Sequence, residues 1–191
     1  MSARARSLRR AKPTVTRRLP ARRRRCGIVG SVARVVTIGV YGWELDRFLD
    51  ALAGADVRLL IDVRQRRGVR GPEYAWANAA RLQAALAGAG VEYRHRKDLA
   101  PTTELRHLQY AEDARRGVGK RSRVELADEY RTRYTLEILD RAPLGQIVSE
   151  LPIDGASALL CVERDPEACH RSIVAERMAT GHGVAVDHLR P

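Results

Sequence analysis

The chain has 191 residues, a formal net charge of +12 and 45% hydrophobic residues. This length predicts one domain with its own core, and no apolar run approaches the roughly 20 residues that cross a bilayer, which argues against a membrane protein and against a membrane partner. The three cysteines, Cys26, Cys161 and Cys169, form an odd and sparse set, which favours a reducing cytoplasm over a disulfide framework.

The excess of positive charge lies at the N-terminus. Residues 1–34 contain 12 of the 35 Lys and Arg and none of the 23 Asp and Glu, so the remainder is neutral. This block repels itself and lacks periodic apolar residues, which predicts a disordered basic arm before a domain over residues 35–191. The arm could bind nucleic acid electrostatically, and its composition also resembles a transit segment. A start codon assigned too early explains the arm equally well. We assign no function to it.

Apolar runs alternate with amphipathic segments through the rest of the chain. Runs rich in β-branched residues predict buried strands, and apolar residues spaced by three and four predict helices. The expected strands cover residues 35–40, 57–64, 91–96, 156–163 and 184–189. The expected helices cover residues 45–54, about 75–88, about 105–114, roughly 123–141, and a last segment that begins at 165–166.

This alternation predicts an α/β fold: a single domain with a mostly parallel β-sheet flanked by helices in three Rossmann-like layers. Ligands of such sheets bind outside the carboxyl ends of the strands. The charged segments fall at those ends, namely "YGW" (41–43), "DVRQRRGVRGP" (62–72) and "ERDPEACHR" (163–171). We therefore expect the polar chemistry, including Tyr41, at one edge of the sheet.

The last helix carries an arginine on its apolar stripe. Asp165 suits an N-cap and Pro166 the first helical position, and Arg171 then shares a face with residues three, four and seven positions later. An inward guanidinium needs a partner, because an unpaired buried charge is very costly. Two partners stay open: a carboxylate at a strand end, Asp62 or Glu163, or an anionic ligand near a helix N-terminus.

The second strand ends in a similar concentration of charge. Asp62 and Arg64 lie two residues apart, so both face one side of a strand. The following loop adds Arg66, Arg67 and Arg70 among glycines that allow a close backbone approach. Such arginines suit the phosphates of a nucleotide or nucleic acid. A mobile solvated loop explains them as well.

The cysteines allow a thiol interpretation. Cys161 lies in a strand and is expected to be a small core residue, whereas Cys169, beside His170 in the first turns of a helix, is a candidate nucleophile with a lowered pKa. A phosphatase-like cradle needs an arginine six residues after its cysteine. Those positions hold Glu167 and Ala175, which disfavours that class.

A zinc site built from Cys161, Cys169 and His170, with His182 or His188, is also disfavoured. Seven residues separate the cysteines, unlike the close pairs of structural zinc sites, and neighbouring helical side chains diverge by about 100°. The chain has neither a P-loop nor a Gly-x-Gly-x-x-Gly after its first strand, so the familiar ATP and dinucleotide sites are unsupported.

Four segments resemble a known family. "TIGV", "LLIDVRQRRGVRGPEY", "GVEYRH" and "LLCVERDPEACHRSIVAERM" occur in this order over roughly residues 35–180. They are similar to domain of unknown function 488 (DUF488). Many members have His-Ser where this chain has Val40-Tyr41, and Pro and Ser where it has "QRRGVRG".

The resemblance implies an α/β fold, a clustered site and no settled activity. The residues that it carries over are Asp62, Arg64, Glu163, Cys169, His170 and Arg171.

We predict a small enzyme acting on a phosphate-bearing ligand, a nucleotide or a nucleic acid, as a hydrolase or transferase. The alternatives are a non-catalytic binding module and a thiol enzyme that uses Cys169. The candidate catalytic residues are Asp62, Glu163, Cys169 and His170. The candidate ligand-binding residues are Tyr41, Arg64, Arg67, Arg70 and Arg171. Mg²⁺ held by Asp62 or Glu163 stays open as a cofactor.

Overall fold

The structure, a computed structural model, describes residues 32–191. The prediction of a basic arm falls almost entirely on residues 1–31, which lie outside the described residues. The chain is already in the first strand at Arg34. No helix of residues 32–191 is long and apolar enough to cross a membrane.

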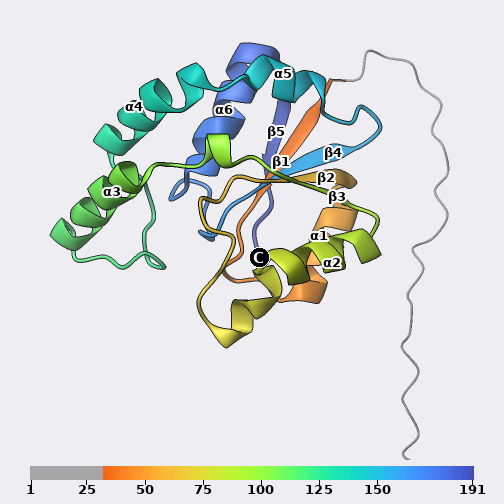
Figure 1. Cartoon of the computed structure of the whole chain (residues 1–191), viewed down its shortest axis with the longest axis horizontal. Coiled ribbons are helices and arrows are strands. Elements are labelled where there is room, and N and C mark those ends of the chain that lie inside the picture. The colour runs from red at the N-terminus through yellow and green to blue at the C-terminus, as the bar shows by residue number, and fades with distance from the viewer. Residues whose placement is uncertain (1–31) are drawn as a thin grey trace, which may run out of the picture.

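Five parallel strands form one sheet in the order β3-β2-β4-β1-β5 (Figure 1). The strands are β1 (Arg34–Ile38), β2 (Val57–Asp62), β3 (Glu92–His95), β4 (Ala156–Leu160) and β5 (Ala185–His188). All five predicted strands are present, although β1, β2 and β4 end two or three residues earlier than expected. The residues just beyond them leave the sheet and, as shown below, build the site.

Helices connect the strands. They are α1 (Leu45–Gly54), α2 (Ala79–Gly88), α3 (Thr103–Arg115), α4 (Asp128–Glu137), α5 (Leu144–Ser149) and α6 (His170–His182), with the 3-10 turns η1 (Pro72–Ala77), η2 (Lys97–Leu99) and η3 (Leu139–Arg141). The long helix predicted over 123–141 is shorter than expected, because α4 begins only at Asp128, and α5 was not predicted.

Successive side chains of β1, β2 and β4 enter different cores. Leu60 and Leu160 pack with α1 and α2 on one face of the sheet, whereas Leu59 and Leu159 pack with α4, α5 and α6 on the other. Figure 1 shows these helices on opposite sides of the strands. The three-layer α/β prediction is confirmed, and the period of two along each strand decides which face a polar residue joins.

The strand order creates the crevice expected at the carboxyl edge. β4 lies between β1 and β2, and Leu160 is in register with both Ile38 and Asp62. The three strands therefore end at one level, and the segments that follow them emerge side by side. Such a change in strand order is where open α/β sheets bind ligands.

Candidate functional site

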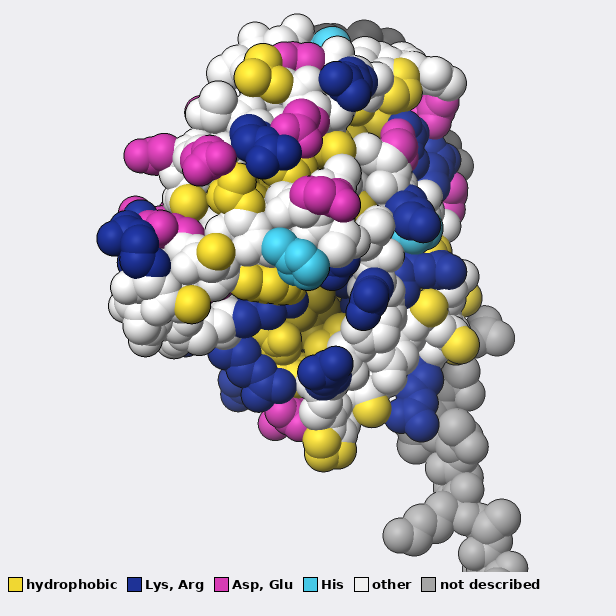
Figure 2. Space-filling view, turned by 60° about the vertical axis from the view of Figure 1, so that its left-hand side comes forward, with side chains coloured by type: hydrophobic (Ala, Val, Ile, Leu, Met, Phe, Trp, Pro, Cys, Tyr) yellow, Lys and Arg dark blue, Asp and Glu magenta, His cyan; other side chains and the backbone are white. Residues whose placement is uncertain are grey.

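A cavity of about 480 Å³ opens at the carboxyl edge of β1, β2 and β4. Its walls come from the loop after β2, from α3, from the loop that follows α3, and from the segment after β4. Figure 2 shows a hollow on this side of the molecule, with hydrophobic side chains in its floor and Lys and Arg side chains around it. This size is ordinary for a small-molecule site.

Four polar side chains of the cavity wall lie in contact with one another. The Sγ atoms of Cys161 and Cys169 lie 3.3 and 3.2 Å from the same carboxylate oxygen, Oε2 of Glu163. Each Sγ is also 3.9 Å from Nδ1 of His170. We call Cys161, Glu163, Cys169 and His170 the thiol cluster. All four residues are buried, and all four line the cavity.

The imidazole of His170 has a fixed orientation. Its Nε2 lies 3.1 Å from the carbonyl oxygen of Val63, and since a carbonyl only accepts, Nε2 carries the hydrogen and donates it. In the neutral ring the lone pair is then on Nδ1, which faces the two sulfurs. The ring also packs against Tyr134, with centroids 5.4 Å apart.

The environment shifts the pKa values of the two thiols in opposite directions. Burial raises the pKa of Cys169, but the hydrogen bond with Cys161 and the charges of Arg171 and His170 outweigh it and hold that pKa well below its ordinary value. The hydrogen bond with Cys169, together with burial, raises the pKa of Cys161 well above its ordinary value. Burial lowers the pKa of His170, yet the neighbouring Cys169 and Glu163 raise it overall.

Local backbone geometry brings the cluster together. The last helix begins at His170 and not at 165–166, so that prediction is wrong: Cys169 is the N-cap, with extended backbone angles of φ −141° and ψ 139°. Because Cys169 is not helical, its side chain does not diverge from His170 as two helical neighbours would. The geometric argument against a shared site for these two residues therefore does not apply.

The segment after β4 is held against the end of β1. The backbone amides of Val40 and Tyr41 both donate to the carbonyl oxygen of Val162, at 3.1 and 3.0 Å. A Cβ on Gly39 would lie 2.0 Å from the carbonyl oxygen of Glu163. Only glycine allows this approach, which positions Glu163 at the cavity.

Cationic side chains dominate the cavity wall. Six of them line it, against a single carboxylate, that of Glu163: Arg64, Arg66, Arg70, Arg106, Lys120 and Arg123. Nζ of Lys120 lies 3.5 Å from Oε1 of Glu163. Within residues 32–191, Arg66, Arg70 and Arg106 pair with no carboxylate, and the buried Nε of Arg106 has no hydrogen-bond partner.

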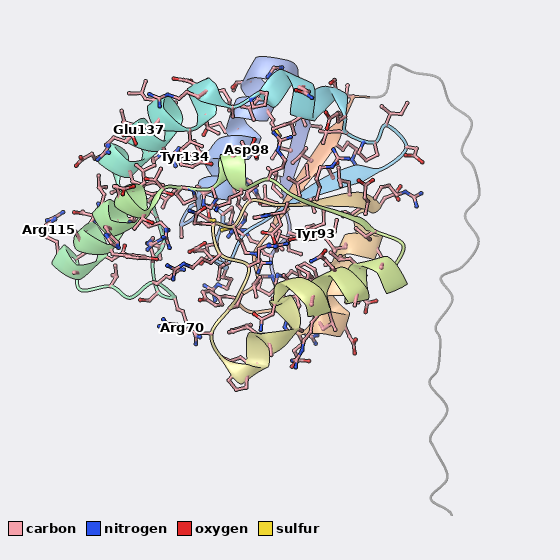
Figure 3. The ribbon with its side chains drawn as sticks, viewed as in Figure 1. Arg70, Tyr93, Asp98, Arg115, Tyr134 and Glu137 are labelled. Atoms are coloured by element: carbon pink, nitrogen blue, oxygen red, sulfur yellow. The ribbon has the colours of Figure 1, made fainter. Side chains whose placement is uncertain are left out.

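The loop after α3, residues 116–127, crosses from α3 to the segments that follow β1 and β2. Arg123 forms a buried ion pair with Asp113 of α3. The guanidinium of Arg121 lies over the rings of Tyr41 and Tyr74, 5.1 and 5.5 Å from their centroids, and donates to the carbonyl of Arg70 at 3.3 Å. Figure 3 shows Arg70 on the loop after β2, close to this crossing loop.

Asp62 and Arg64 form a buried ion pair, of which only Arg64 contributes to the cavity wall. The Nε and an Nη of Arg64 donate to the two carboxylate oxygens of Asp62, at 2.8 and 2.7 Å, and its second Nη donates to the carbonyl of Ala77. The hydroxyl of Tyr93, labelled on β3 in Figure 3, donates to Asp62 at 2.7 Å. Asp62 is fully buried and does not line the cavity.

Arg171 is fully buried, as its place on the apolar stripe predicted. Its partners are neither Asp62 nor Glu163 carboxylate oxygens. One Nη donates to the carbonyl of Glu163 at 2.6 Å, the other to the carbonyl of Arg164 at 2.9 Å, and Nε lies 3.4 Å from Oγ1 of Thr37. Arg171 therefore positions the backbone of the segment after β4.

The structure brings six of the nine candidate residues to the cavity wall and leaves three outside it. Those in the wall are Tyr41, Arg64, Arg70, Glu163, Cys169 and His170. Those outside are Asp62, Arg67 and Arg171. Sequence reasoning missed the contributions of α3 and its loop, namely Arg106, Lys120 and Arg123. The basic loop near residue 120 was visible in the sequence, but nothing there indicated that it folds over the strand ends.

Comparison with known proteins gives one result. The model of the family described as "Domain of unknown function DUF488" matches residues 44–178, most of the chain. The matched range contains the thiol cluster and all six cavity cations. No curated protein and no solved structure matches the chain.

Proposed function

The chain belongs to the DUF488 family, and we propose that it is an enzyme that binds a phosphate-bearing ligand, a nucleotide or a nucleotide unit of a nucleic acid, in the basic cavity. The observation that carries this proposal is the wall composition, six cations against one carboxylate around about 480 Å³. That volume suits one nucleotide-sized group.

Three arginines are the ligand-binding groups of this proposal. Arg66, Arg70 and Arg106 have no carboxylate partner within residues 32–191, so their guanidinium groups are available to an anion. Guanidinium groups bind phosphate oxygens through paired, charge-assisted hydrogen bonds.

Glu163 is the group that makes an enzyme more plausible than a binding module. Among residues 32–191 it is the only carboxylate in the wall, and it lies beside two thiols and Lys120. Glu163 would accept the proton of a water or hydroxyl that attacks the ligand, the general-base step of a hydrolase or transferase.

The thiol-enzyme alternative has weaker support. Cys169 is only 1% exposed, and a nucleophile has to reach the atom that it attacks.

Because both thiols are free in the structure, the proposed activity belongs in a reducing compartment such as the cytoplasm.

Ligand binding is tested with AMP and with inorganic phosphate by isothermal titration calorimetry. We expect Arg66→Ala/Arg70→Ala to weaken AMP binding by at least about tenfold, since each lost charge-assisted hydrogen bond is worth roughly 1.5–3 kcal/mol. The matched control is Arg47→Ala/Arg81→Ala, which removes two exposed arginines of α1 and α2 outside the cavity. Equal affinities of the two double variants would refute the proposed site.

Turnover is tested with a panel of nucleotides and single-stranded oligonucleotides, with and without Mg²⁺. We expect Glu163→Gln to keep AMP affinity and to lose turnover, whereas Glu167→Gln, an exposed carboxylate of the same segment, keeps both. Binding without any product across the panel would establish a non-catalytic module in place of the enzyme.

A further inference from the structure

The thiol cluster contains a set of metal ligands that the proposed function does not use. Sγ of Cys161, Sγ of Cys169 and Nδ1 of His170 all lie within 4.8 Å of one another. Two sulfurs and one imidazole nitrogen are donors that Zn²⁺ prefers in proteins. The three residues are buried and also line the cavity, so the protein covers the donors except on the side that faces the cavity.

The spacing of the donors fits one cation. Zn–S bonds of about 2.3 Å and Zn–N bonds of about 2.0–2.1 Å at a tetrahedral angle separate sulfur from nitrogen by about 3.6 Å. The two Nδ1–Sγ separations are both 3.9 Å. Closing them needs a shift of a few tenths of an ångström, which side-chain torsions supply.

Hydrogen bonds and backbone structure fix the orientation of these donors, as they do in metal sites of proteins. A metal-ligating histidine donates its other ring hydrogen to a carbonyl or carboxylate, and Nε2 of His170 donates to the carbonyl of Val63 at 3.1 Å. Cys169 is fixed at the N-cap of α6, where its own amide donates to the carbonyl of Pro166 at 3.0 Å. Cys161 follows β4 directly. The backbone that carries each of the three donors is therefore held in place by secondary structure or hydrogen bonds.

We propose that Cys161, Cys169 and His170 bind a zinc-class divalent cation with one coordination position facing the cavity. Three protein ligands with an open position are typical of catalytic zinc, whereas structural zinc has four. Glu163, whose Oε2 contacts both sulfurs, lies next to that position. It would orient a water bound at that position.

The charge of the site suits such a cation. Two thiolates and the Glu163 carboxylate would place three negative charges in a buried cluster, and an isolated buried charge is very costly. A divalent cation compensates two of them, and Lys120 lies 3.5 Å from Oε1 of Glu163. This inference is independent of the ligand proposed above, because none of its donors is a cavity arginine.

The test uses the untagged full chain, purified under reducing conditions and titrated with Zn²⁺ and with Co²⁺. We expect one equivalent of Zn²⁺ per chain by elemental analysis. We also expect Co²⁺ to give thiolate-to-metal charge-transfer absorption and intense d–d bands of tetrahedral coordination. Cys161→Ser and Cys169→Ser should each weaken Zn²⁺ binding by at least about 100-fold, while Cys26→Ser, which changes the one cysteine outside residues 32–191, leaves it unchanged.

Two results would overturn the inference. One is a wild-type Co²⁺ complex that shows no thiolate charge transfer, a measurement that does not depend on any variant folding. The other is loss of the metal in Cys26→Ser with retention in both other variants. AMP binding by the same preparations is scored separately, so loss of the metal site and loss of the proposed function remain distinguishable.

Discussion

The two arginines buried deepest near the site have every guanidinium nitrogen in a hydrogen bond within the protein. Arg64 is bound by Asp62 and the carbonyl of Ala77, and Arg171 by the carbonyls of Glu163 and Arg164. Both are 2% exposed or less. Arginines that we predicted as ligand contacts thus have most of their hydrogen-bonding capacity occupied within the protein, and the arginines free for a ligand lie on the loop after β2 and on α3.

Removal of Arg171 should therefore destabilise the protein. In Arg171→Met the carbonyls of Glu163 and Arg164 lose their donors, and breaking such a buried charged network costs about 3 kcal/mol or more. Urea unfolding followed by circular dichroism measures the change. Arg177→Met, on the same helix but half-buried and paired with Asp140 at the surface, is the control and should cost less than about 1 kcal/mol. Equal stabilities of the two variants would contradict the positioning role.

The pair of Asp113 and Arg123 predicts an acid-dependent loss of stability. Burial raises the pKa of Asp113, but hydrogen bonds from Arg123 and Gln109 and the charge of Arg123 lower it below its ordinary value of 3.8. The pair's contribution is therefore complete above the unfolded pKa and is lost as pH falls through the lower, folded value.

Unfolding free energies of the wild type and Asp113→Asn, measured from pH 7 down to pH 2, test this dependence. We expect the wild type to be more stable by about 3 kcal/mol at pH 7, because the variant leaves Arg123 buried without its partner. The difference should shrink below pH 4. A difference that stays constant over the whole range would contradict the assignment.

At the scale of elements, the site depends on how closely the segment after β4 approaches β1. Gly39→Ala would place a Cβ 2.0 Å from the carbonyl oxygen of Glu163, so the segment has to move, at a cost of about 2 kcal/mol. Gly54→Ala at the end of α1, where a Cβ meets nothing within 4 Å, should be neutral or slightly stabilising. Thermal unfolding compares the two, and a Gly39→Ala protein as stable as Gly54→Ala would contradict the close approach.

The alternation along the strands explains which parts of the site the sequence could predict. Asp62 and Arg64 were expected to share a side, and they do, but it is the side of α1 and α2. Cys161 and Glu163 emerge toward α6. Predicting that the two pairs lie on opposite faces of the sheet requires the register of β2 against β4. That register cannot be read from the two strand sequences taken separately. The N-cap role of Cys169 was hidden for a similar reason, because Asp165 and Pro166 form an equally good helix start on local grounds.

At the scale of the whole molecule, the strand pattern predicted the parallel sheet and the edge at which the polar segments meet. It did not predict the wall formed by α3 and its loop, since the contacts of Arg121 with Tyr41 and of Lys120 with Glu163 join residues far apart in the chain. The complete cavity exists only once that loop has folded over the strand ends. The six cations found in its wall lie between Arg64 and Arg123, outside the basic segment 1–34.

The most direct measurement of the central claim is a crystal structure of the protein soaked with tungstate, a heavy-atom analogue of phosphate. We predict an anomalous peak inside the cavity, within hydrogen-bond distance of at least two of Arg66, Arg70 and Arg106, the wall arginines without a carboxylate partner in residues 32–191. A cavity without a peak, in crystals where tungstate binds elsewhere on the surface, would contradict the account.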